Sequence, residues 1–201
     1  MHSVTVTSEL TTEVADKVLA LCRAAGDSDG AYPLSEHVVL HIRGGSPAHH
    51  VLIQSGEGGE ELEGYAHVDS SDLVDGPSAE LVVHPMRRRR GHGHRLVDAA
   101  IGIAEEQDPQ GRLRLWAHGD HPSASALAIR LGFARHRSLW QMRRSLYTPI
   151  EAPVLPEDVT VRAFRPGHDE EAWLAVNTRA FAEHPEQGRW SLVDLKRRMA
   201  E

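Results

Sequence analysis

One stretch, residues 80–94 (E-L-V-V-H-P-M-R-R-R-R-G-H-G-H), constrains the fold of this chain more than any other. It opens with a short apolar run that stops at Pro85, which predicts a buried strand. An arginine tract at 87–90 then leads into Gly91 and Gly93, and a helical pattern starts after them. This order predicts a strand, a glycine-rich turn and a helix N-terminus that follow one another directly.

The helix after the turn is predicted by apolar residues that share one face, namely Leu96, Val97, Ala100, Ile101 and Ala104. Glycines let the backbone approach a ligand closely, and the first N–H groups of a helix have no acceptor within it. The helix dipole also favours an anion at this end, so a phosphate or pyrophosphate is the expected ligand. The alternative is a basic turn on a solvated surface.

Two common phosphate-binding motifs do not fit this turn. A P-loop needs Lys-Ser or Lys-Thr after its glycines, and the dinucleotide fingerprint needs a third glycine where Leu96 stands. Instead, Arg88-x-x-Gly91-x-Gly93 after a strand that ends at Val83 resembles the acetyl-CoA pyrophosphate loop of the GNAT N-acetyltransferases.

The pattern of the whole first part predicts the order β-α-α-β-β-β-α-β-α-β, a mixed α/β (α+β) sandwich of about one domain. The expected strands are 4–6, 49–54, 63–68, the strand before Pro85, 112–117 and 138–144; the expected helices are 8–25, 35–41, the helix after Gly93, and 123–131, capped by Ser123. The GNAT resemblance implies the same order, with a mixed, mostly antiparallel central sheet flanked by helices. Leu131-Gly132-Phe133 matches the end of that family's second signature helix.

The rest of the chain repeats the opening of the first part. Residues 159–161 echo residues 4–6, a helix at 169–182 echoes the first helix, and 191–199 takes the place of the second. We therefore expect a GNAT-like acetyl-CoA-binding domain at 1–146, a proline-rich linker at 147–158, and the opening segment of a second, incomplete GNAT-like domain at 159–201.

Several local strings narrow the resemblance: E-L-V-V-H-P, W-A-H-G, Q-M-R-R and F-A-x-H-P-E-Q-G-x-W resemble the mycothiol synthase family. That family joins two GNAT domains and uses acetyl-CoA to acetylate the cysteinyl amine of Cys-GlcN-Ins in the last step of mycothiol biosynthesis. The resemblance implies that this chain lacks most of the C-terminal domain. The alternatives are a non-catalytic acetyl-CoA-binding scaffold domain and a GNAT enzyme that acts on another amine.

The resemblance also implies site residues. The backbone of Leu81, Val82 and Val83 would line the pantetheine arm, and the N–H of Val83 would polarise the thioester carbonyl. The pyrophosphate would be held by Arg88, Arg89, Arg90, Gly91, His92, Gly93 and His94. Glu36 and Glu186 would contact the amine-bearing substrate, although Glu36 could equally be an ordinary acid in a first helical turn.

The catalytic groups depart from the family pattern. Ala128 occupies the position of the usual general-acid tyrosine, and His121 that of the usual asparagine. Glu80 is a candidate base, with a solvent-facing glutamate at a strand edge as the alternative, and His118 is a weaker candidate. No catalytic residue is assigned, and the first domain is expected to bind acetyl-CoA without turning it over.

Composition excludes other classes. A net charge of -7 argues against a third hypothesis, a nucleic-acid-binding module built on the arginine tract. Cys22 is the only cysteine, so no intrachain disulfide or Cys-based metal cluster can form, and H-x-x-H at His118 and His121 is too little to predict a metal. With no long apolar segment in the sequence, we expect a cytoplasmic protein, without a membrane partner and monomeric.

Overall fold

The computed structural model describes residues 3–44, 48–56, 60–72, 75–182 and 190–200. The chain divides into two compact units, Met1–Ala134 and Arg135–Glu201, and each is described by itself. Among the described residues, no helix is long and apolar enough to cross a membrane.

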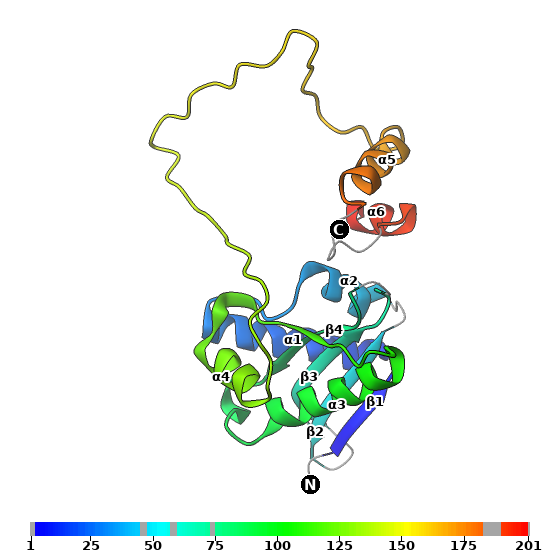
Figure 1. The fold of residues 1–201 in the computed structure, drawn as a ribbon, viewed down its shortest axis with the longest axis vertical. Helices are drawn as coiled ribbons and strands as arrows, with labels where there is room; N and C mark the ends of the chain where they lie inside the picture. Colours follow the sequence, from blue (N-terminus) through cyan, green and yellow to red (C-terminus); the bar gives the residue numbers. More distant parts are fainter. Residues whose placement is uncertain (1–2, 45–47, 57–59, 73–74, 183–189, 201) are drawn as a thin grey trace. The chain divides into compact units, whose positions relative to one another are not determined.

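The first unit is built on a five-stranded sheet in the order β1-β2-β3-β4-β5 (Figure 1). Its strands are β1 (Ser3–Thr7), β2 (His49–Ser55), β3 (Glu61–Asp69), β4 (Ser78–Val83) and β5 (Arg114–Trp116). The first four strands pair in antiparallel fashion, and β5 lies parallel to β4. The mixed, mostly antiparallel sheet is therefore confirmed.

Helices cover both faces of this sheet. They are α1 (Thr12–Asp29), α2 (Glu36–Gly44), α3 (His92–Gln107) and α4 (Pro122–Arg130), with short 3-10 helices at Pro85–Arg87 and His118–Asp120. Because side chains alternate along a strand, Leu52 of β2 packs with α1 and α2, whereas Val51 and Ile53 pack with α3. The sheet thus separates two apolar cores.

Helix boundaries differ from the prediction where polar side chains cap the backbone. The start of α1 predicted at Ser8 was wrong, because Thr11 is extended and its hydroxyl accepts the N–H of Val14 at 3.3 Å. The cap predicted at Ser123 was also wrong: Nδ1 of His121 accepts the N–H of Ser123 at 3.2 Å, and Pro122 opens the helix. Gly132 does take the predicted left-handed conformation, with φ of 82°.

Two further differences concern which residues are buried and paired. On α3, Ile103 is buried and Ile101 only half-buried, because the face from Leu96 continues at i+7. Strand β5 is shorter than the predicted 112–117, since the side chain of Asp108 accepts the Arg112 N–H at 3.0 Å and holds residue 112 in the turn after α3.

The predicted last strand, 138–144, was wrong. These residues have no regular secondary structure, and Trp140 is 84% exposed. Alternating residues fit a strand, but a strand also needs a neighbour to pair with, and the described sheet ends at β5. The strand predicted at 159–161 is absent for the same reason.

In the described part of the second unit, α5 (Glu170–Ala180) and α6 (Leu192–Met199) confirm the two predicted helical segments. Ser191 and Asp194 form a reciprocal capping box at the start of α6. Residues 135–165 contain neither helix nor strand. Glu186 lies outside the described residues.

Candidate active site

The site begins where β4 and β5 separate. Their pairing runs from Ser78↔Arg114 to Glu80↔Trp116 and ends there, while β4 continues to Val83. The last residues of β4 therefore keep β3 on one side and have no strand partner on the other within the described sheet. A parallel pair that opens in this way exposes backbone hydrogen-bonding groups to a ligand.

The direction of the Val83 backbone follows from its neighbour. The N–H of His84 donates to the carbonyl of Glu63 on β3 at 2.9 Å. Because successive residues of a strand direct their backbone groups to opposite sides, those of Val83 face away from β3, into the opening beyond β5. The Val83 carbonyl accepts from Nε of Arg88 at 3.3 Å, so its N–H is the group directed at the opening.

The loop after β4 leads to an open helix end. Arg89 and Gly91 have positive φ angles of 63° and 85°, and Gly91 precedes α3 without a side-chain cap. The first backbone bond of α3 runs from the N–H of Arg95 to the carbonyl of Gly91 at 3.1 Å. The N–H groups of residues 92–94 therefore lie in the turn that has no acceptor within the helix, which is the geometry of an anion site.

The four arginines of this loop differ in their contacts. Arg88 makes a bidentate pair with Asp29, the last residue of α1, at 2.8 and 2.7 Å, and this hydrogen bond lowers the pKa of Asp29. Arg87 lies 2.6 Å from Glu61 on β3. Arg89 and Arg90 are exposed at the surface. The first two hold the loop, and the last two lie at the open helix end.

A buried acid supports the loop from inside. Glu63 and His92 are each 2% exposed, and Oε2 of Glu63 lies 2.8 Å from Nε2 of His92. Oε1 accepts the hydroxyl of Ser55 at 2.8 Å and lies 3.3 Å from Arg87. The His92 side chain thus points inward, and only its backbone is at the helix end. Sequence reasoning missed Glu63, although a charged residue in a predicted buried strand is a signal.

Glu80 does not face solvent, so the alternative of an exposed strand-edge glutamate was wrong. It is 8% exposed, and Oε2 accepts the N–H of Ser35 at 2.5 Å and Nε2–H of His118 at 3.2 Å. Burial raises the pKa of Glu80, but the hydrogen bonds from His118 and Ser35 outweigh it and leave the pKa below its usual value. This carboxylate is ionised and committed to structural contacts.

The remaining predicted residues lie on or beside helices α2 and α4. Glu36 is exposed and begins α2, next to the Ser35 that Glu80 holds. Ala128 lies on α4 and offers only a methyl group, while His121 caps that helix. Sequence and structure together leave no proton donor at the Ala128 position.

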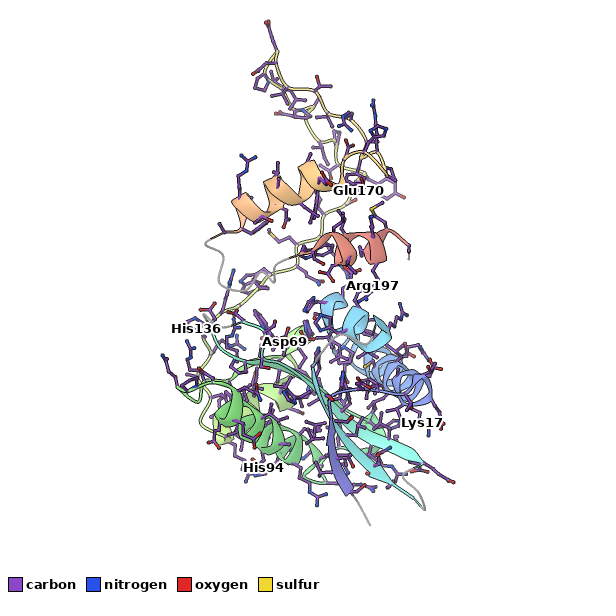
Figure 2. The ribbon with its side chains drawn as sticks, turned by 90° about the vertical axis from the view of Figure 1, so that its right-hand side faces the viewer. Lys17, Asp69, His94, His136, Glu170 and Arg197 are labelled. Atoms are coloured by element: carbon purple, nitrogen blue, oxygen red, sulfur yellow. The ribbon has the colours of Figure 1, made fainter. Side chains whose placement is uncertain are left out.

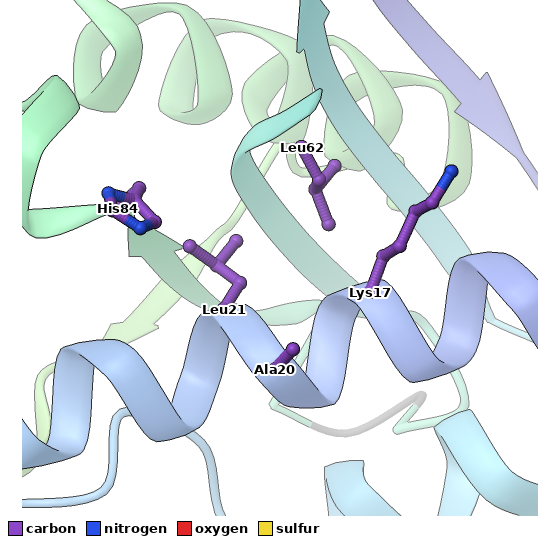
Figure 3. Close-up of a pocket in the computed structure, with 5 residues that line it drawn as sticks. All are labelled: Lys17, Ala20, Leu21, Leu62 and His84. Carbon is purple, nitrogen blue, oxygen red and sulfur yellow. The ribbon is translucent and has the colours of Figure 1, made fainter. Parts of the chain in front are cut away.

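A separate pocket of about 210 Å³ lies between α1 and the sheet, lined by Lys17, Ala20, Leu21, Leu62 and His84 (Figure 3). Drug-sized ligand sites run from about 300 Å³ upward, so this pocket is small for a nucleotide cofactor. It contains none of the predicted cofactor residues, and Lys17 is paired with Glu13 at 2.8 Å. The open end of α3 is the better anion site.

Comparison with known proteins decides the family. Residues 20–133, more than half of the chain, match the family described as Acetyltransferase (GNAT) family. The chain belongs to the GNAT family. A solved GCN5-related N-acetyltransferase from Sphaerobacter thermophilus superposes with a TM-score of 0.63 and 26% identity, over 92% of this chain and 60% of that one.

Named relatives of this GNAT chain are more similar still. It is 55% identical to a mycothiol acetyltransferase of Salinispora arenicola, over 94% of this chain and 59% of that protein. It is 53% identical to a mycothiol acetyltransferase of Acidothermus cellulolyticus, over 92% and 56%. The chain spans less than two thirds of the length of these relatives.

Proposed function

We propose that this chain supplies the acetyl-CoA-holding domain of an acetyltransferase of mycothiol biosynthesis, which acetylates the cysteinyl amine of Cys-GlcN-Ins. The observation that carries the proposal is the opening between β4 and β5 beside the uncapped N-terminus of α3. The relatives are named mycothiol acetyltransferases, which supports an acetyl transfer in mycothiol biosynthesis.

Each part of acetyl-CoA has a matching group in this arrangement. The pyrophosphate binds the N–H groups of His92, Gly93 and His94 together with the exposed Arg89 and Arg90. Gly91 keeps the approach open, while Arg88 ties the loop to Asp29. The pantetheine arm follows the backbone of residues 81–83.

The acetyl group would then lie at the Val83 N–H, which points into the opening and polarises the thioester carbonyl. Removing one such donor from a working oxyanion hole costs about 3 kcal/mol in transition-state stabilisation. In the transfer, the amine nitrogen forms a bond to the carbonyl carbon, the carbon–sulfur bond breaks, and CoA leaves as a thiolate. The amine must lose a proton, and the thiolate must gain one.

Among the described residues of the first unit, the two main candidate positions do not supply these proton transfers. Glu80 is ionised but committed to Ser35 and His118, and Ala128 cannot donate a proton. We therefore propose that this domain holds acetyl-CoA without turning it over, and that proton transfer belongs to the second GNAT-like domain of the whole protein. Glu36 and Glu186 are proposed as substrate contacts of that reaction.

Three expectations about the protein's setting also stay proposals: a cytoplasmic location, a monomeric state and the absence of a nucleic-acid partner. Only the last has support from the chain's own chemistry. A net charge of -7 repels the phosphate backbone of nucleic acids. Acetyl transfer itself is proposed to need no metal.

Titration calorimetry with acetyl-CoA tests the proposal. Gly91→Leu places a side chain at a φ of 85°, a conformation that strains an L-residue by about 1–2 kcal/mol. A tenfold change in affinity corresponds to about 1.4 kcal/mol, so the variant should bind acetyl-CoA at least about tenfold more weakly. Gly102→Leu, on an open stretch of the same helix, is the matched control and should bind normally. Circular dichroism checks that both variants fold.

A CoA-release assay with a Cys-GlcN-Ins-like amine completes the experiment. Binding without release supports a cofactor-holding domain. Binding with release would contradict the non-catalytic part of the proposal, and no binding by the unaltered chain would overturn the site.

A further inference from the structure

A cluster of side chains that can bind a metal lies at the C-terminal end of β3. The proposed cofactor loop contacts the N-terminal end of the same strand, at Glu61 and Glu63. His37 and His41 extend from α2, and Asp69 ends β3 (Figure 2 labels Asp69). One ligand atom from each of the three lies within 4.8 Å of the others. None of these residues has a part in the acetyl-CoA site.

The geometry of this cluster is that of a three-ligand site. His37 and His41 are four residues apart, so they share one helix face, and their ring centroids are 4.0 Å apart. Nε2 of His37 lies 3.5 Å from Oδ2 of Asp69. Ligands at about 2.1 Å from a tetrahedral metal ion are about 3.4 Å from one another, so this edge already has the required length.

Asp69 is oriented for such a role. Its Oδ1 accepts the N–H of Ser71 at 2.8 Å, which leaves Oδ2 on the side of His37. A backbone bond to the second oxygen is the kind of outer contact that fixes a ligating carboxylate.

A second, independent observation lies behind these three residues. His67 of β3 is 1% exposed, and neither of its ring nitrogens has a hydrogen-bond partner in the described part of the chain. Its ring lies 5.4 Å from that of His41 and 5.5 Å from that of His50. A buried imidazole without a partner is unfavourable, so apolar packing alone does not explain it.

The neighbouring buried ring, His50 of β2, already has a partner, because the hydroxyl of Tyr65 lies 2.7 Å from its Nδ1. Among the described residues, His67 is therefore the buried imidazole beside His41 that has no hydrogen bond.

We propose that His37, His41 and Asp69 bind one divalent transition-metal ion of the Zn²⁺ class, with His67 as the buried group beside it. Two imidazole nitrogens and one carboxylate oxygen are a typical ligand set for Zn²⁺ and leave a fourth position open. His37 is exposed at the surface, which gives the ion a path into the site. Small side-chain rotations close the remaining distance.

The bound ion would tie α2 to the end of β3. Helix α2 starts at Glu36, directly after the Ser35 that hydrogen-bonds Glu80. The ion would therefore add a second attachment between this helix and the sheet. This inference does not depend on the proposed acetyltransferase function.

The test is a titration of the chelator-treated 201-residue chain with Co²⁺, followed by visible absorption, and with Zn²⁺, followed by calorimetry. We expect one tight ion per chain and the intense visible band of four-coordinate Co²⁺. His37→Ala and Asp69→Asn should each lower affinity at least about 100-fold, and His67→Phe, which leaves all three ligands in place, should lower it less.

His94→Ala is the matched control, because Nε2 of His94 lies 3.2 Å from Oδ2 of Asp98 on another helix and this pair offers only two ligands. It should leave the tight site unchanged. The proposal is overturned if the chain binds no ion tightly, if His37→Ala and Asp69→Asn bind normally, or if His94→Ala weakens binding equally. Acetyl-CoA affinity, measured alongside, should be unchanged in His37→Ala, which separates this site from the cofactor site.

Discussion

The loop between β4 and α3, which we propose as the cofactor site, differs from the segment around Ala128, which we propose as the position of the general acid. The loop has a backbone shaped by Gly91, a bidentate tie from Arg88 to Asp29 and a buried support in Glu63. At the other position, α4 offers a methyl group, and the candidate base Glu80 is hydrogen-bonded to Ser35. In the proposed function, holding a cofactor and transferring its acyl group therefore rest on different residues, so mutations should separate them.

The largest expected effect concerns the support of the loop. Glu63→Ala should destabilise the first unit by about 3–5 kcal/mol, because it leaves the buried His92 without its acidic neighbour. Glu61→Ala removes the exposed partner of the same Arg87 and should cost at most about 1 kcal/mol. Urea denaturation of both variants measures the difference in the free energy of unfolding. Equal losses of stability would show that the buried Glu63–His92 pair contributes no more than the exposed Arg87–Glu61 pair.

A smaller effect is expected at Arg88. Arg88→Ala should lower stability by about 1 kcal/mol, since its pair with Asp29 is only partly buried. It should also weaken acetyl-CoA binding by loosening the loop. Arg89→Ala should weaken binding without changing stability, and its effect should shrink at high salt, as expected for a direct anion contact. Calorimetry at two salt concentrations distinguishes the two roles.

The contacts of Glu80 predict that the stability of the fold depends on pH. Since the pKa of Glu80 is lowered in the folded state, its stabilising contribution is complete above the usual glutamate pKa of about 4.3 and is lost as the pH falls below it. Glu80→Gln should therefore flatten the stability profile in that acidic range and leave the profile above it unchanged in shape. An unchanged acidic slope in this variant would contradict the assigned contacts of Glu80.

The smallest effect, on CoA release, is expected from restoring a general acid at position 128 alone. Ala128→Tyr restores a phenol at the family position, but no free base accompanies it, so CoA release with a Cys-GlcN-Ins-like amine should stay at background. Ala128→Phe controls for the added ring. Robust turnover in the tyrosine variant, and not in the phenylalanine variant, would show that the first unit lacks only the general acid for acetyl transfer.

Much of the fold could be predicted because its signals are local. The strands β2 and β3, most of the apolar face of α3 and the left-handed Gly132 all depend on neighbouring residues, and they were predicted. The strand at 138–144 was predicted from the same kind of signal and is absent, since alternation does not supply a pairing partner. The helix caps at Thr11 and His121 were missed because several nearby polar residues compete for one cap.

By itself, the sequence determined the strand, turn and helix of residues 80–94, the family that they indicate and the missing tyrosine at Ala128. Only the tertiary structure decided that the pairing of β4 with β5 ends at Glu80↔Trp116 and that Glu63 contacts His92. It also decided that His37, His41 and Asp69 lie close together. Chain geometry between neighbours fixes the first set. The second set joins residues far apart in the sequence, and their distances, burial and pKa values exist only once the sheet and helices have packed.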